Sequence, residues 1–296
     1  MKEHDSGVLY QAVTNRRIQL GFLLPSFLCL DAPLVALGWS VAVTFDSGGS
    51  TDTCIPKLLL LFFGVWSVYL ADRIYDSYRL SEVRELTSRH RFAIRFRPLM
   101  WTLLATAAVA GLSQLINIKD PSYLSKGVIL AAATAVYFAV FRLVPNCWCR
   151  WIRGKEIVIS LCFAFGVMLT ADTTGPSILN GILALGLASI CLYNCLIISY
   201  SESAFDGQHD PQAFYALRPE LPPPAWPGWI SGIAGCLVFL IDGGLLVGSS
   251  LLISSAALHY LSRSIDRDKS APFVQAAADA LLLLPWPIVI LIVLIL

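Results

Sequence analysis

The sequence predicts an all-α integral membrane protein with nine transmembrane helices. Three observations lead to this fold class. The 296 residues are 56% hydrophobic and only 14% charged, which is too apolar for a water-soluble domain of this length. Apolar runs near the roughly 20 residues needed to cross the hydrocarbon recur from one end of the chain to the other. Of the 21 lysine and arginine residues, 18 fall on one side of the predicted spans.

The apolar runs define the spans in chain order. Residues 1–17 are polar, and the run that follows has no small-residue cleavage pattern, so we expect the first run to stay as an anchor. The predicted spans are 18–45, 55–75, 97–117, 126–144, 154–171, 177–200, 229–246, 247–263 and 272–296. The seventh and eighth runs touch, and together they are too long for one crossing, so a turn is expected within the glycine-rich stretch 242–248. The spans predict a single transmembrane domain over residues 1–296.

The basic residues decide the predicted orientation, because lysine and arginine in short loops stay on the cytoplasmic side. With a cytoplasmic N-terminus, only Lys57, Lys119 and Lys126 fall outside. An odd number of spans then places the C-terminus on the outer side. We expect a multi-pass protein of a bacterial inner membrane.

Two cytoplasmic loops are long and polar, residues 72–97 after the second span and residues 201–228 after the sixth. Four spans separate them, and an even number of crossings returns the chain to the same face. The pattern predicts two parallel four-helix halves plus a ninth helix. The Leu-Pro-Pro-Pro stretch 221–224 cannot continue a helix, so it should break the chain before the seventh span.

Carboxylates with helical spacing stand at the start of both loops. Asp72 and Asp76 lie four residues apart, so they share one helix face if the second span continues to about residue 78. Glu202, Asp206 and Asp210 repeat this spacing after the sixth span. If the two halves pack as repeats, five carboxylates converge and need a cation to offset their repulsion. Magnesium suits such a site, because it binds one or two carboxylates together with phosphate oxygens.

Arginines accompany the acidic residues in the first loop. Arg73, Arg89 and Arg91 could bind a diphosphate through paired hydrogen bonds. The alternative is that these residues are solvated loop charges and that the arginines only set the topology.

Span count, orientation and the two acidic motifs resemble the UbiA-type intramembrane prenyltransferases. The first motif of that family reads Asn-Asp-x-x-Asp-x-x-x-Asp and the second Asp-x-x-Asp-x-x-x-Asp. Residues 71–76 (ADRIYD) are similar to the first, with Asp76 at its central aspartate and Asp72 in place of the asparagine. Residues 87–91 (TSRHR) look like the family's Thr-x-Arg-x-Arg segment, and Asp206 and Asp210 match the last two aspartates of the second motif.

The chain also departs from the family pattern. Arg73 replaces an aspartate and Leu80 the last aspartate of the first motif, while Ser203 replaces the first aspartate of the second motif, with Glu202 beside it. An arginine there could neutralise a neighbouring aspartate and so leave a site with fewer magnesium ions or none.

The resemblance implies a membrane prenyltransferase that binds an isoprenoid diphosphate at the cytoplasmic face and transfers its prenyl group to an acceptor from the lipid phase. Within this reading Asp72, Asp76, Asp206 and Asp210 are the catalytic and magnesium-binding residues, and Arg73, Arg89, Arg91, Asn194 and Glu202 bind substrate. Membrane lipid is an expected partner and nucleic acid is not. The alternatives are a non-catalytic relative that binds a lipid or a protein, and a small transporter, although the two halves lack matched Gly/Pro interruptions at mid-membrane.

Three polar residues lie inside apolar runs. Asp31 and Asp279 would each cost roughly 2.5 to 3.5 kcal/mol at the bilayer centre, so both should face the bundle interior or lie near an interface. Asn194 lies two turns before Glu202 and could bind a substrate or another helix.

Overall fold

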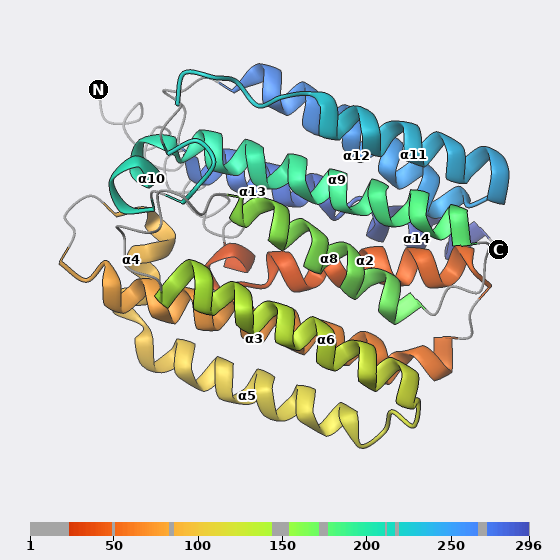
Figure 1. Ribbon diagram of the computed structural model, residues 1–296, viewed down its shortest axis with the longest axis horizontal. Coiled ribbons are helices and arrows are strands. Elements are labelled where there is room, and N and C mark those ends of the chain that lie inside the picture. The colour runs from red at the N-terminus through yellow and green to blue at the C-terminus, as the bar shows by residue number, and fades with distance from the viewer. Residues whose placement is uncertain are drawn as a thin grey trace, which may run out of the picture.

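The computed structural model describes residues 24–48, 51–82, 86–143, 154–171, 177–210, 212–216, 219–265 and 271–295. All regular secondary structure in these ranges is helical, which confirms the predicted all-α class for this part of the chain. The long helices run side by side along the longest axis of the molecule (Figure 1). The first six residues of the first predicted span, 18–23, lie outside the described ranges.

The helices follow most of the predicted apolar runs with small shifts at their ends, except that the first predicted span, 18–45, is interrupted at residues 28–30 and its helix α2 begins only at Asp31. They are α2 (Asp31–Asp46), α3 (Thr51–Arg79), α4 (Ser88–Arg95), α5 (Arg97–Leu115), α6 (Pro121–Phe138) with the π-helical turn η1 (Ala139–Leu143), α8 (Lys155–Ala171), α9 (Ser177–Ser201), α10 (Ser203–His209), α11 (Trp226–Asp242), α12 (Leu245–Ser264), α13 (Ala271–Leu282) and α14 (Pro285–Ile295). Short helices α4 and α10 lie in the two loops that were predicted to be polar.

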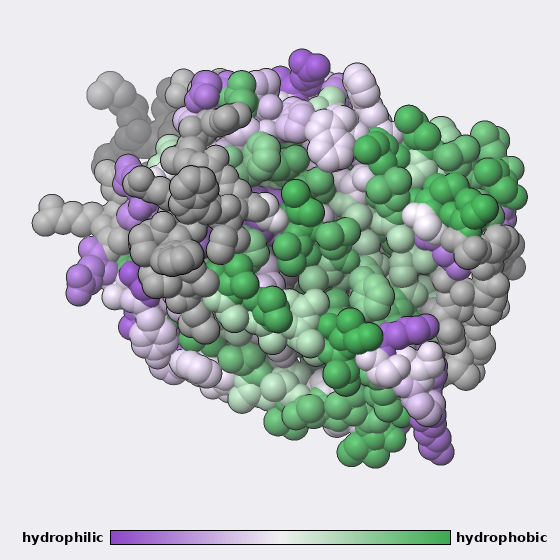
Figure 2. All heavy atoms as spheres, viewed as in Figure 1, coloured by the Kyte–Doolittle hydropathy of each residue, from purple (hydrophilic) through white to green (hydrophobic). Residues whose placement is uncertain are grey.

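Six helical segments among the described residues are long and apolar enough to cross a membrane. They are Cys54–Arg79, Arg97–Leu115, Pro121–Phe141, Ile178–Ser201, Leu245–Ser264 and Phe273–Ile290. Helix α11 is also apolar but has 17 residues, the same length as α8, and α2 has 16. These segments indicate an integral membrane protein. Figure 2 agrees, because hydrophobic residues cover much of the middle of the visible face.

The ninth predicted span is not one continuous helix. It consists of α13 and α14, which are separated by a turn at residues 283–284. Pro285 begins α14, and proline has no amide hydrogen to continue the hydrogen-bond ladder of α13. The Leu283 amide instead bonds the Ala280 carbonyl at 3.1 Å, a tightened last turn.

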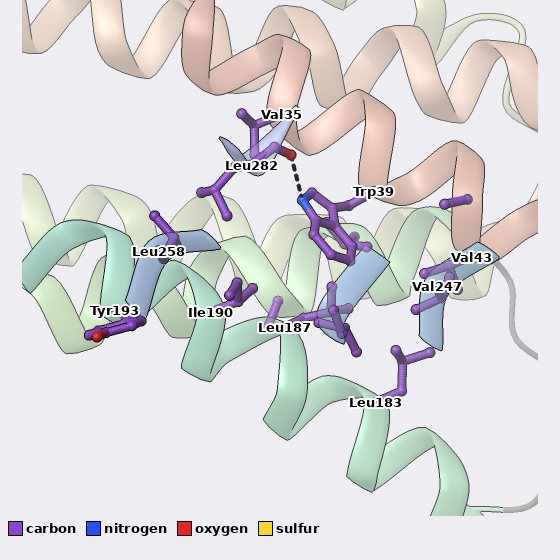
Figure 3. Close-up of a cluster of buried hydrophobic side chains, with 14 of the residues drawn as sticks. Val35, Trp39, Val43, Leu183, Leu187, Ile190, Tyr193, Val247, Leu258 and Leu282 are labelled. Atoms are coloured by element: carbon purple, nitrogen blue, oxygen red, sulfur yellow. Dashed lines mark hydrogen bonds between the residues drawn. The ribbon is translucent and has the colours of Figure 1, made fainter. Parts of the chain in front are cut away.

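A large apolar core lies where α2 meets α9, α12 and α13 (Figure 3). Its central side chain is Trp39 of α2, which is fully buried. The Trp39 indole Nε1 donates a hydrogen bond of 3.0 Å to the Leu282 carbonyl at the end of α13. Helix α2 is thereby held to the point where the last predicted span breaks.

The turn predicted within residues 242–248 is confirmed. Helix α11 ends at Asp242, and Gly243 adopts a left-handed conformation with φ of 68°, which glycine tolerates without steric cost. Helix α12 then packs back on α11. Gly235 and Gly248 face each other so closely that a Cβ on Gly235 would lie 2.8 Å from the Gly248 carbonyl oxygen, so the missing side chains permit backbone contact.

Candidate functional site

The two acidic motifs meet at one end of the bundle. In Figure 1 the C-terminal end of α3, α4 and α10 lie together at the left of the molecule. Helix α3 continues to Arg79, so Asp72 and Asp76 do occupy successive turns of one helix, as the sequence required. Figure 2 shows hydrophilic residues gathered near this end.

The second motif keeps its helical spacing across the interruption between helices α9 and α10. Helix α9 ends at Ser201, and Glu202 is the first residue outside α10. The Asp206 amide bonds the Glu202 carbonyl at 2.9 Å, and the Asp210 amide bonds the Asp206 carbonyl at 2.7 Å. The three acidic residues therefore follow one another at single-turn intervals.

An ion pair joins the first loop to the second motif. The Arg89 guanidinium on α4 contacts the Glu202 carboxylate, and their side chains are only 15% and 6% exposed. The Arg89 Nε and Glu202 Oε1 atoms are buried and have no hydrogen-bond partner among the described residues. Each of these side chains therefore has hydrogen-bonding capacity left for a ligand.

Arg73 lies among the acidic residues rather than apart from them. Its guanidinium interacts electrostatically with Asp72, Asp76 and Glu202, and it hydrogen-bonds the Cys29 thiol. The arginine that departs from the family motif thus brings a fixed positive charge to the acids of both motifs.

His90 also belongs to this cluster, which the sequence did not reveal. Its Nε2 atom lies 3.8 Å from Asp76 Oδ2, its Nδ1 atom lies 2.7 Å from the Thr87 hydroxyl, and its ring stacks on Phe205. Burial lowers the pKa of His90, and the hydrogen bond with Asp76 opposes that shift. The His90 ring packs from α4 against Phe205 of α10. In the sequence, the only indication of this role is its place in the TSRHR segment.

Lys155 is a second residue that sequence reasoning assigned only to topology. It begins α8 and forms an ion pair with Asp210. The neighbouring Asp206 is 8% exposed. Burial raises the pKa of Asp206 to about 8, Lys155 opposes this shift, and the negative charge of Glu202 adds to it.

A small pocket opens beside the Arg89–Glu202 pair. It is lined by Ser26, Phe27, Thr87, Ser88, Arg89, Glu202 and Gln275. Its volume of about 10 Å³ holds roughly one water molecule. Hydroxyl groups, an amide, the Arg89 guanidinium and the Glu202 carboxylate border it. An oxyanion could bind the hydroxyl groups and Arg89 once the pocket widens, provided that it displaces Glu202 from the guanidinium.

Two predicted substrate-binding residues lie away from this pocket. Arg91 is exposed on α4. Asn194 is buried within α9, and its Nδ2 atom donates a hydrogen bond of 2.9 Å to Asp279 Oδ1 on α13. The amide therefore takes part in a contact between helices, one of the two roles that its position allowed.

The carboxylates are suitable donors for magnesium, but neighbouring basic side chains already contact three of them. Asp76 contacts His90, Glu202 contacts Arg89, and Asp210 contacts Lys155. Within the described ranges, no three His, Cys, Asp or Glu side chains are arranged to hold a metal ion. In this arrangement a magnesium ion would have to displace a basic side chain from its partner.

No family model, curated protein or solved structure matches this chain. The expected resemblance to the UbiA-type prenyltransferases therefore rests on the predicted span pattern and on the motif residues around Asp76, Arg89 and Asp206, and membership of that family stays a prediction.

Proposed function

We propose that this protein is a divergent UbiA-like membrane prenyltransferase that binds an isoprenoid diphosphate at the end of the bundle that carries α4 and α10. The observation that supports it is the Arg89–Glu202 ion pair, which brings the basic segment of the first loop to the second acidic motif. Two sequence segments more than 100 residues apart thereby contribute to one polar site, as a diphosphate site shared by two motifs requires.

We further propose nine crossings, with the shorter helices α2, α8 and α11 as three of them and α13 with α14 as the last. This topology places the N-terminus and the polar site on the cytoplasmic side of a bacterial inner membrane and the C-terminus outside. A helix of 16 or 17 residues spans about 25 Å, which reaches across most of the hydrocarbon when loops or flanking turns complete the crossing.

In the proposed reaction the basic residues hold the diphosphate and stabilise the charge that builds on it as it leaves. Arg73, Arg89 and Lys155 supply that charge, and Arg91 could join them from the exposed face of α4. The allylic carbocation left behind is captured by an acceptor from the lipid phase. Magnesium would add further stabilisation of the leaving group if it binds Asp72, Asp76, Asp206 and Asp210.

A second candidate function is non-catalytic binding of a phosphorylated lipid. Two observations favour it. Ion pairs with Arg89 and Lys155 already neutralise Glu202 and Asp210, so these two carboxylates have less capacity for magnesium. The pocket beside Arg89 also has to widen before a diphosphate enters it. Such a protein would bind the same donor without transferring its prenyl group.

Binding and transfer of a labelled donor separate these functions. Purified protein in nanodiscs is titrated with farnesyl diphosphate with and without magnesium, and then incubated with a membrane lipid extract. Arg89→Ala should weaken binding at least tenfold, because a charge-assisted contact is lost. Arg95→Ala, which removes an exposed arginine from the same helix, should leave binding unchanged.

Release of diphosphate together with a prenylated lipid product supports the transferase. Binding without product supports the non-catalytic function. If wild-type protein binds neither farnesyl diphosphate nor inorganic diphosphate, with or without magnesium, both functions are wrong.

A further inference from the structure

A second polar cluster lies one helical turn from the Arg89 pocket along α13, where Gln275 lines the pocket and Asp279 belongs to the cluster. Asp31 begins α2, Asn194 lies on α9 and Asp279 lies on α13. The sequence places both aspartates in apolar runs and predicts that they avoid lipid. The structure brings them together, because the Asp279 carboxyl group hydrogen-bonds both the Asn194 amide and the Asp31 carboxyl group.

The contact between two carboxyl groups requires a proton. An ionised carboxylate only accepts hydrogen bonds, so two of them cannot bond each other, whereas a carboxylic acid can donate to a carboxylate. Asp31 Oδ1 accepts the Ala32 amide at 3.0 Å, at the N-terminal end of α2 where negative charge is favoured. Asp279 Oδ1 accepts the Asn194 amide hydrogen, as the carbonyl oxygen of a protonated acid can. All three contacts can form when the shared proton lies on Asp279.

The charges around the pair decide whether it can hold two negative charges. In the described part of the chain, the groups that interact with it include Tyr69, Cys29, Cys195 and Arg89, and Arg73 lies next to Cys29. A phenol and two thiols are neutral near neutral pH. Arg89 is paired directly with Glu202, and Arg73 interacts with Asp72, Asp76 and Glu202. A second carboxylate charge would thus stay largely unbalanced in a low-dielectric interior.

Asn194 also has unused hydrogen-bonding capacity beside this cluster. The residue is 5% exposed, and its Oδ1 atom has no hydrogen-bond partner in the described part of the chain. Its Nδ2 atom is committed to Asp279, so Oδ1 lies on the same carboxamide, next to the acid pair. A buried acceptor at this place suits a water or hydronium ion, which has hydrogens to donate.

We propose that Asp31, Asn194 and Asp279 form a proton-binding site within the membrane-spanning part of the bundle. In the loaded state Asp279 holds the proton and donates it to Asp31, while Asn194 fixes the Asp279 carbonyl oxygen. On release, the Asp279 O–H bond breaks, the proton passes to a water molecule beside Asn194 to form hydronium, and two carboxylates remain. This site binds a cation in the bundle interior, whereas the Arg89 pocket is suited to an anion.

Infrared spectroscopy of the carboxylic C=O stretch tests the proposal in the full-length protein. Asp206, whose pKa is raised to about 8, would give a similar band, so all variants are made in an Asp206→Asn background. At pH 7 this background should show one protonated buried carboxyl group. Asp279→Asn should remove the band. Asn194→Ala should shift it to higher frequency, because a hydrogen bond to the carbonyl oxygen is lost.

The matched control is Asp242→Asn, which removes an exposed carboxyl group at the end of α11 and should leave the band unchanged. Circular dichroism checks that each variant keeps its helices. Three results would overturn the proposal. The band could be absent at pH 7, it could persist in Asp279→Asn, or it could appear only when sodium is withdrawn, which would identify the site as one for a metal cation.

Discussion

The region of α3, α5 and α6 is about as apolar as the region of α9, α12 and the segment Phe273–Ile290, but much less of it is buried. In α9, α12 and the segment Phe273–Ile290, 56%, 44% and 39% of the most apolar window is buried inside the protein. In α3, α5 and the segment Pro121–Phe141 the corresponding shares are 28%, 17% and 0%. A helix in lipid has no need to hide apolar side chains from water, so apolarity alone does not specify packing. The two regions are therefore alike in apolarity but not in packing.

The contrast extends to what holds each region together. The core around Trp39 joins α2 to the helices of the second half, whereas the smaller core of Leu70, Ile74, Met100 and Ala107 joins α3 to α5. At the polar end, the Arg89–Glu202 ion pair connects the two regions. Dispersion contacts thus dominate one region, and charge contributes where the regions meet.

The largest effect is expected from two tryptophans, one in each region. Trp39→Ala should lower the free energy of unfolding by about 3 to 5 kcal/mol, because it leaves a cavity in the main core and an unpaired carbonyl on Leu282. Trp101→Ala on α5 removes a side chain that is 50% exposed and should cost about 0.5 kcal/mol or less. Unfolding in detergent micelles measures both. Equal losses would mean that the regions are packed alike.

The next effect concerns the ion pair at the junction. Arg89→Ala should cost about 2 to 3 kcal/mol, somewhat less than a fully buried pair, because the Arg89 side chain is 15% exposed. The double variant Arg89→Ala with Glu202→Ala should be more stable than the sum of the single losses predicts, since neither charge is left alone. Arg95→Ala on the same helix is the control. Additive losses would show that this pair does not couple the regions.

Two glycines provide a smaller comparison. In the tightly packed half, Gly235→Ala should cost about 1 to 2 kcal/mol, because its Cβ would lie 2.8 Å from the Gly248 carbonyl oxygen. In α3, an added Cβ on Gly64 meets nothing within 4 Å, so Gly64→Ala should be neutral or gain up to about 1 kcal/mol of helix propensity. Melting temperatures of the two variants measure this difference in stability. A stabilising Gly235→Ala would contradict the close helix contact.

The last comparison is a pH dependence at the junction. The pKa of Asp206 is raised by burial to about 8, above its ordinary value of 3.8, so the folded protein favours the protonated acid. This contribution to stability is complete below pH 4 and is lost as the pH rises through about 8. Melting temperature should therefore fall by a few degrees between pH 6 and 9. Asp206→Asn should flatten this slope, and an unchanged slope would assign it to another group.

The apolar pattern predicted most of the helices, because a helix needs about 20 apolar residues to cross the hydrocarbon and each such run is visible in the sequence. It located α9 to within one residue of its ends, and the glycine-rich stretch correctly predicted the turn at Gly243. The break before Pro285 was missed, since the residues on both sides of it are as apolar as a continuous span. A proline inside such a run does not by itself predict a break, because neighbouring helices can satisfy the backbone groups that it leaves unbonded.

Spacing along the chain placed Asp72 and Asp76 on one helix, but it could not identify their partners. His90 and Lys155 reach the acidic residues only through the packing of α4 and α8 against neighbouring helices, and no local pattern encodes such contacts. The same holds for Asp31 and Asp279, which lie almost 250 residues apart and were predicted only to avoid lipid. Magnesium binding by Asp72, Asp76, Asp206 and Asp210 stays a prediction, as does binding of a prenyl donor by Arg73 and Arg89.

The indole contacts around the break between α13 and α14 have a consequence for biosynthesis. Trp39 of α2 bonds the carbonyl of Leu282, and Trp286 of α14 bonds the carbonyl of Leu34 at 2.9 Å, so the first described helix and the last two hold one another. During translation α2 emerges long before its partners. Until Leu282 and Trp286 have been synthesised, the indole N–H of Trp39 lacks its hydrogen-bond partner, and α2 is held only by the membrane or by a chaperone. Ribosome-bound chains that stop before residue 282 should therefore be far more sensitive to protease than complete ones.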